Sequence, residues 1–195
     1  MSLEGKRIGF AITGSHCTFA AIIPVIEELV KLGAIVQPVV SPAVQTTDTR
    51  FGNSKDWIEK FETITGKKVI DSIVKAEPMG PSIPVDCMVI APMTGNTMAK
   101  LANGITDTAV MMATKATLRN NSPVVLAVST NDGLGLNGMN LMKLIATKNI
   151  YFVPFGQDDP IKKQNSLVAD MNLVIPTILK ALEGKQIQPV LIERV

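Results

Sequence analysis

Short continuous hydrophobic runs alternate along this chain with longer stretches in which apolar residues recur at helical spacing. Runs of four to seven residues bounded by turn residues have the length and composition of strands buried on both faces. They occur at Arg7–Thr13, Ala34–Val40, Cys87–Ala91, Val124–Ser129 and Ile150–Val153. This pattern predicts a parallel β-sheet that is covered by helices.

The stretches between these strands carry the apolar stripe of amphipathic helices. Five of them are expected to be helical: Phe19–Leu32, Asn53–Ile64 with Ser54 as its cap, Thr108–Arg119, Asn140–Ala146 and Val174–Leu182. A sixth helix is expected from the pattern of Met98, Leu101 and Ala102. The order of elements predicts an α/β fold with a doubly wound parallel sheet, in one domain over residues 1–195.

Other segments are expected to be irregular. Two prolines and a glycine make Glu77–Pro81 a turn-rich loop, and Phe155–Lys163 reads as a polar loop. Pro92 is expected to end the pairing of the third strand, because proline has no N–H to donate.

Small polar residues stand where the third strand meets the following helix. Thr94, Gly95, Asn96 and Thr97 follow Pro92 directly. A helix N-terminus directs free backbone N–H groups and a partial positive charge at one point, which suits an anion or a nucleotide. The alternative is an ordinary helix cap formed by Thr94 or Asn96 without a ligand.

Four loops are expected to meet at the carboxyl edge of the sheet, where doubly wound folds bind ligands. They are Gly14–His16, Ser41–Pro42, Pro92–Thr97 and Asn131–Asn140. Gly14 permits close backbone approach and Ser15 offers a hydroxyl, but there is neither a Walker lysine nor the GxGxxG fingerprint of NAD sites.

Composition narrows the function classes. The net charge of +2 and the 4% aromatic content give no reason to expect a nucleic-acid or anionic-membrane partner. One histidine and two cysteines without zinc spacing predict no metal site, and Cys17 and Cys87 are expected to be packed thiols. The apolar run Ile8–Ile12 is too short for a signal or a membrane span, so a cytoplasmic location is expected.

The sequences TGSHCTF and APMTGNTMAKLANGITD resemble the two signatures of the flavoprotein family of cysteine-type decarboxylases. That family includes phosphopantothenoylcysteine decarboxylase, lantibiotic decarboxylases and flavin prenyltransferases, and its second signature is commonly written PASANT. The resemblance covers most of the chain and implies a Rossmann-like flavoprotein fold with FMN. The residues it implies for FMN binding are Gly14, Ser15, His16, Ser41, Pro92, Thr94, Gly95, Asn96 and Thr97.

The chain departs from the decarboxylases at several positions. Pro78 stands where they carry a histidine, Asn137 replaces the leading proline of their substrate clamp, and Gly95 replaces an alanine. Met139–Asn140 matches the clamp, but Lys143–Leu144 replaces its terminal Met-Trp. Because proline cannot transfer a proton, cysteine decarboxylation is disfavoured.

The sequences HCTF, EPMGP and GLGLNGMN are similar to a branch of the family that forms one component of a two-component synthase in endospore-forming bacteria. This implies oxidation of a dihydropyridine precursor to a pyridine dicarboxylate in the mother cell, beside a dehydrogenase-like partner that carries NAD(P). Asn96 and Asn140 would orient the small dicarboxylate, and a cation among Lys100, Lys115 and Lys143 would pair with it.

Alternatives stay open at this point. The chain could be an FMN-dependent decarboxylase or flavin-modifying enzyme, or a non-catalytic scaffold for a dehydrogenase. The resemblance also implies a homo-oligomer, for which the helix at Thr108–Lys115 is a candidate contact, although burial in the chain's own core explains its apolar residues equally well.

Overall fold

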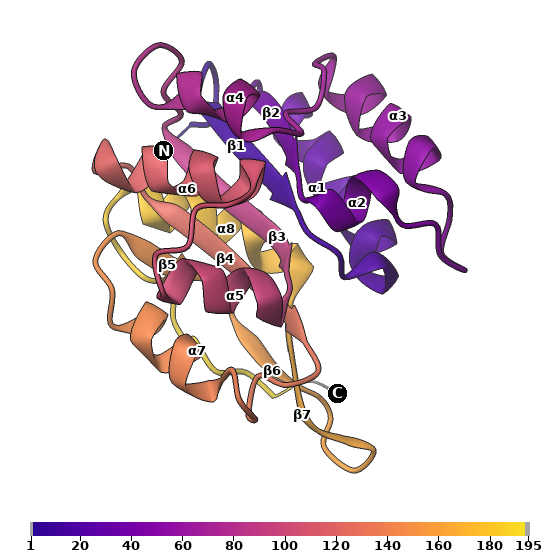
Figure 1. The fold of residues 1–195 in the computed structure, drawn as a ribbon. Coiled ribbons are helices and arrows are strands. Elements are labelled where there is room, and N and C mark those ends of the chain that lie inside the picture. The colour runs from indigo at the N-terminus through magenta and orange to yellow at the C-terminus, as the bar shows by residue number, and fades with distance from the viewer. Residues whose placement is uncertain (1, 194–195) are drawn as a thin grey trace.

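The computed structural model describes residues 2–193 and has a seven-stranded sheet at its centre (Figure 1). Five strands are parallel and lie in the order β2-β1-β3-β4-β5. Their bounds are β1 Arg7–Ile12, β2 Ile35–Val40, β3 Cys87–Met93, β4 Val124–Thr130 and β5 Ile150–Phe152. The prediction of a mostly parallel, Rossmann-like α/β sheet is therefore confirmed. Residues 1, 194 and 195 of the expected domain lie outside the described residues.

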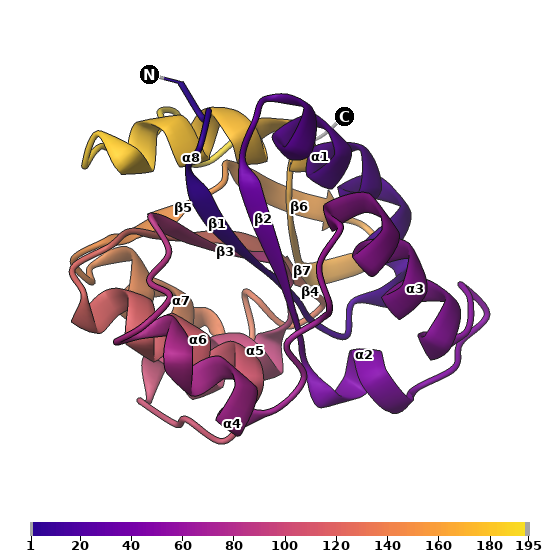
Figure 2. The ribbon, with the colours of Figure 1, turned by 90° about the horizontal axis from the view of Figure 1, so that it is seen from above.

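Helices cover both faces of this sheet (Figure 2). One face is covered by α1 (Phe19–Lys31) and α8 (Val174–Leu182), and the other by α5 (Gly95–Ala102) and α6 (Ala109–Arg119). The remaining α-helices are α2 Pro42–Thr46, α3 Ser54–Thr65, α4 Ile73–Ala76 and α7 Gly138–Ile145, and the 3-10 turns are η1 His16–Thr18, η2 Glu77–Met79 and η3 Met171–Leu173. The core lies between these layers because both faces of β1, β3 and β4 are apolar.

The expectation of a polar loop at residues 155–163 was wrong. Strands β6 (Phe155–Asp159) and β7 (Lys163–Ala169) form an antiparallel hairpin instead. Strand β7 pairs with the end of β4, where Ser129 lies opposite Val168. The outer part of the hairpin is polar because it extends beyond the core, and its composition therefore resembled that of a loop.

The expectation that Pro92 ends the third strand was also wrong. Strand β3 continues to Met93, which pairs with Val128 of β4 after a shift of register beyond Ile90. Proline is tolerated at such an irregularity because no ladder hydrogen bond requires its missing N–H.

Two helix starts also differ from expectation. Asn53, not Ser54, is the N-cap of α3, and the Ser54 N–H donates to the Asp48 carboxylate at 2.8 Å. Ser41 stands at the N-cap of the short helix α2, with Pro42 as its first residue. Proline suits this position because the first helical N–H has no partner within the helix.

The apolar residues of α6 are explained by the chain's own core. Ala109, Val110, Met111, Ala113 and Thr114 are all buried against the sheet and α5. These residues therefore offer no free contact for a second copy of the chain.

Thr13 joins β1 to the end of β3. Its fully buried hydroxyl donates to the Pro92 carbonyl at 2.7 Å and accepts from the Thr94 N–H at 3.0 Å. One side chain therefore satisfies two backbone groups at the turn from which α5 begins.

We expect Thr13→Val to lower the free energy of unfolding by about 2–5 kcal/mol, because the isosteric change leaves two buried backbone groups without a partner. Chemical denaturation measures this change. Thr46→Val is the control, because the exposed Thr46 hydroxyl donates only to the Pro42 carbonyl of its own helix and its loss should cost about 0.5 kcal/mol or less. Equal losses in both variants would contradict the role given to Thr13.

Candidate functional site

A cavity of about 930 Å³ lies at the carboxyl ends of β1, β3 and β4 and reaches the β6–β7 hairpin. Its lining combines the first residues after β1, the start of α5, the end of β4 and both strands of the hairpin. The lining includes Gly14, Ser15, His16, Cys17, Arg50, Phe51, Thr94, Gly95, Asn96, Ser129, Thr130, Asp132, Asp158 and Lys163. We call this space the large cavity.

A second cavity of about 330 Å³ adjoins the first and shares Gly14, Thr94 and Asn96 with it. We call it the small cavity, and Ser41, Pro42, Ala43, Thr97, Lys100 and Thr108 complete its lining. The Ser41 backbone N–H donates to the Ile12 carbonyl, which holds this loop against β1. The buried Ser41 hydroxyl oxygen has no hydrogen-bond partner among the described residues.

Helix α5 begins between the two cavities. The Thr94 hydroxyl caps it by accepting from the Thr97 N–H at 3.4 Å, so the ordinary helix cap is present. Within the described residues the backbone N–H groups of Gly95 and Asn96 have no acceptor. These free donors and the helix dipole favour an anion at the same point. The cap is therefore present, and it leaves two backbone donors at the start of α5 free for an anion.

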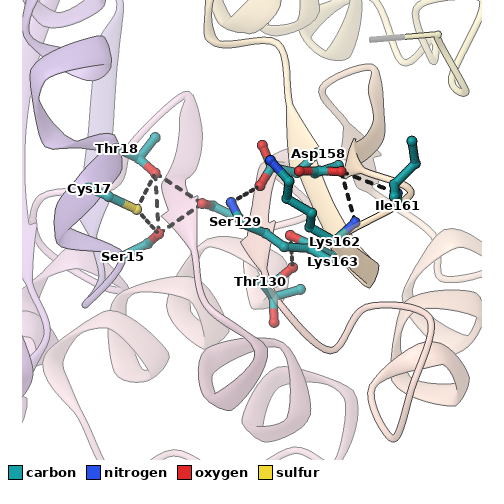
Figure 3. A network of polar contacts seen from close by, with 11 residues as sticks. Ser15, Cys17, Thr18, Ser129, Thr130, Asp158, Ile161, Lys162 and Lys163 are labelled. Carbon is teal, nitrogen blue, oxygen red and sulfur yellow. Dashed lines mark hydrogen bonds and ion pairs between the residues drawn. The ribbon is translucent and has the colours of Figure 1, made fainter.

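Three hydroxyl groups form a closed triangle beside the large cavity, whose lining includes Ser15 and Ser129 (Figure 3). Ser15 Oγ lies 2.8 Å from Ser129 Oγ, Thr18 Oγ1 lies 3.0 Å from Ser129 Oγ, and Ser15 Oγ lies 3.2 Å from Thr18 Oγ1. Cys17 Sγ lies 3.8 Å from both Ser15 Oγ and Thr18 Oγ1. Each hydroxyl can both donate and accept, so the triangle suits the hydroxyl groups of a polyol chain.

The two residues after Ser15 also line the large cavity. The His16 ring lies 4.9 Å from the Phe19 ring, centroid to centroid, and its buried Nε2 has no hydrogen-bond partner among the described residues. The expectation of a packed thiol was wrong for Cys17, which is exposed because it lies in the first turn outside the sheet. It was right for Cys87, where burial raises the pKa of the thiol.

Three charged residues of the large cavity, Arg50, Asp158 and Lys163, come from segments that the sequence did not indicate for the site. The Lys163 ammonium lies 2.6 Å from the Asp158 carboxylate, and this hydrogen bond raises the pKa of Lys163. The Arg50 guanidinium lies over the Phe51 ring, 4.9 Å from its centroid. The one sequence signal near the hairpin pair is the turn dipeptide Asp159–Pro160, and Arg50 has none.

The lysines expected to bind a substrate carboxylate lie elsewhere. Lys100 lines the small cavity, but its ammonium lies 2.7 Å from the Asp107 carboxylate, and this hydrogen bond lowers the pKa of Asp107. Lys115 lines a third hollow beside Ile105 and Leu118. Lys143 lies on α7 and lines neither the large nor the small cavity.

Most of the expected FMN-binding residues meet at the two cavities. Gly14, Ser15, His16, Ser41, Thr94, Gly95, Asn96 and Thr97 line one or both of them. Two expected site residues do not. Pro92 is buried within β3, and Asn140 donates to Asn137 Oδ1 at 3.0 Å outside both linings.

We expect one of the two thiols to react with a small disulfide reagent in the native protein. Cys17 is exposed, whereas Cys87 is buried with a raised pKa and therefore has little thiolate. Spectrophotometric thiol titration measures the number. Cys17→Ser should leave no rapidly reacting thiol, and rapid labelling of that variant would contradict the assignment.

No helix in the range 2–193 is long and apolar enough to span a membrane.

Comparisons with known proteins agree with this architecture. The family model described as "Flavoprotein" matches residues 1–175. The B subunit of dipicolinate synthase from Bacillus subtilis is 64% identical over 192 residues, which cover 98% of this chain and 96% of that protein. The crystal structure of the B subunit of dipicolinate synthase from Bacillus halodurans matches with a TM-score of 0.92 and 59% identity over the whole of both chains.

A more distant match is the structure of the FMN-dependent cysteine decarboxylase SpaF, with a TM-score of 0.67 and 20% identity over 92% of this chain and 99% of that one. At this identity the match shows the shared fold. The family model and the full-length relatives together establish that this chain belongs to the flavoprotein family, in the branch that contains the B subunit of dipicolinate synthase.

Proposed function

We propose that this chain is the B-type component of a dipicolinate synthase and holds a flavin nucleotide, FMN, across the two cavities. The main observation in support of a flavin site is the buried Ser41 hydroxyl. It has no hydrogen-bond partner among the described residues, and Ser41 lines the small cavity beside the start of α5. A buried polar group without a partner costs free energy, so a ligand that binds there stabilises the site.

The small cavity fits the phosphate group. The Ser41 hydroxyl and the free N–H of Asn96 supply donors from its lining, and the N-terminus of α5 supplies a positive potential. Lys100 adds a cation that Asp107 already neutralises. Ser41 and Asn96 are therefore the residues that would hold the phosphate.

The large cavity fits the rest of the nucleotide. Gly14, Thr94 and Asn96 line both spaces, so the ribityl chain would pass beside them. The Ser15 and Ser129 hydroxyls would exchange hydrogen bonds with its hydroxyl groups. When bound, a flavin supplies a two-electron acceptor that no protein side chain can replace.

The substrate proposed is a small dihydropyridine dicarboxylate. Arg50 and Lys163 line the large cavity, which Lys115 and Lys143 do not. Lys163 is paired with Asp158 as Lys100 is with Asp107, so Arg50 is the cation best placed for the carboxylates. Asn96 would orient the ring beside the flavin site. Asn140 lies outside the cavities and would act only through its hydrogen bond to Asn137.

The partner proposed is the A subunit of dipicolinate synthase, which would carry NAD(P). Its support is the name of the 64% identical relative, which designates a B subunit. The reaction proposed is the oxidation of the precursor to dipicolinate during endospore formation, in the cytoplasm of the mother cell. Self-association into a homo-oligomer is part of the same proposal.

We expect Ser41→Ala to weaken FMN binding by about tenfold or more, because a hydrogen bond to a charged phosphate is lost. Fluorescence titration measures the dissociation constants of FMN and of riboflavin, which lacks the phosphate. Riboflavin binding should stay within about twofold.

Ser72→Ala is the matched control, since Ser72 caps α4 and lines neither cavity. Equal weakening of both flavins by Ser41→Ala would place the phosphate elsewhere. A purified chain that binds neither flavin would defeat the flavin site.

We also expect dipicolinate formation to require both components of the synthase. Adding this chain to the A subunit, NAD(P) and the precursor should raise the rate at least tenfold, measured by the ultraviolet absorbance of dipicolinate. The same rate with the A subunit alone would remove the catalytic role. Full activity with an Asn96→Ala chain that binds no flavin would favour the non-catalytic scaffold.

A further inference from the structure

A continuous hydrogen-bonded network ties the loop after β4 to the C-terminal end of α5, where Asn103 is the C-cap. The Thr130 hydroxyl donates to Asp132 Oδ1, and the Asn137 amide donates to Asp132 Oδ2 at 2.7 Å. The Asn140 amide donates to Asn137 Oδ1 at 3.0 Å, and the Asn103 amide donates to Asn140 Oδ1 at 3.3 Å. Asp132 is the member of this network with a charge, and it lines the large cavity.

Gly95 makes room for this network. A Cβ atom at Gly95 would lie 2.5 Å from Asp132 Oδ1 and 2.7 Å from both Asn137 Nδ2 and Thr130 Oγ1. Such distances are too short for a methyl group, so any side chain at residue 95 would displace Asp132. The glycine and Asn137, which are two departures from the decarboxylase pattern, therefore serve the same carboxylate.

Within this network the Asp132 carboxylate can only accept hydrogen bonds. An ionised carboxylate has about four lone-pair sites and no proton, and two of these sites are used by Thr130 and Asn137. The Thr130 proton is also used. The remaining lone pairs of Asp132 are available to a donor in the large cavity.

We propose that Asp132 is a specificity-determining residue, which accepts a hydrogen bond from an O–H or N–H donor carried by the substrate ring on the side opposite its two carboxylates. This inference rests on the proposed function and adds to it a donor substituent on the substrate ring and the orientation of that ring. Thr130, Asn137 and Gly95 are positioning residues, because they act through the carboxylate.

The charge of Asp132 determines which end of the substrate lies next to it. A fixed negative charge repels the carboxylates of a dicarboxylate ligand and attracts its neutral donors. The cations of the cavity, Arg50 and Lys163, come from other segments, namely the loop before α3 and the β6–β7 hairpin. The acidic end of the substrate would therefore turn toward them and the donor-bearing end toward Asp132.

Two probes isolate this contact. Pyridine-2,6-dicarboxylate and its 4-hydroxymethyl derivative share the ring and both carboxylates, and the second adds one O–H donor at the side opposite the carboxylates. Calorimetric titration of the full chain, with and without FMN, gives the ratio of the two dissociation constants. We expect the hydroxylated probe to bind about tenfold tighter or more, the effect of a hydrogen bond to a charged acceptor.

Variants test whether Asp132 causes the preference. Asp132→Asn should reduce the ratio to about twofold or less, and Gly95→Ala should do the same by displacing the carboxylate. The matched controls are Asp158→Asn, which removes the other carboxylate of the large cavity, and Gly138→Ala, where a Cβ would meet no atom closer than 3.5 Å. Both controls should keep the ratio of the unchanged chain.

The ratio of the two dissociation constants distinguishes loss of the Asp132 contact from damage to the fold, because a general loss of structure weakens the binding of both probes equally. Equal binding of the probes, absence of binding, or an unchanged ratio in Asp132→Asn would overturn the inference. An equal loss of the ratio in Asp158→Asn would overturn it as well. If the chain binds no FMN, the ratio of the two probes' dissociation constants can still be measured without FMN. The flavin site and the Asp132 contact can therefore fail independently.

Discussion

The candidate site depends on one buried hydroxyl that bridges two strands. Thr13 satisfies the Pro92 carbonyl and the Thr94 N–H together, and this fixes the first turn of α5 against the end of β1. Since Gly14 follows Thr13, the same contact sets the distance between the two loops that both cavities share. The free N–H groups of α5 are therefore held in place before any ligand arrives.

The two cavities differ in the charges that line them. The small cavity offers the Ser41 hydroxyl and the free N–H of Asn96 beside the N-terminus of α5. The large cavity combines the cations Arg50 and Lys163 with the carboxylates of Asp132 and Asp158 and the hydroxyls of Ser15 and Ser129. A ligand that complements both spaces needs an anionic end for the first and a body with both donors and acceptors for the second.

The sequence predicted the central strands, most helix ends and the meeting of the loops around Gly14, Ser41 and Asn96, because these follow from periodicity and from the geometry of parallel sheets. It did not predict the β6–β7 hairpin, whose outer residues have no core to pack against. It also could not show that Asp132 faces the cavity, since that depends on the fit of Asn137 against Gly95. Side-chain networks of this kind leave no periodic signal.

The crowding around Gly95 makes positions 95 and 137 interdependent. Alanine at 95 collides with the Asn137 amide as the chain stands, and a shorter residue at 137 would free part of that space while leaving Asp132 with one partner fewer. The effects of the two exchanges are therefore not additive. Because Asp132, Thr130 and Asn137 all crowd the same point, a methyl group at 95 displaces all three side chains at once, and a change at 137 relieves only one of the three close approaches.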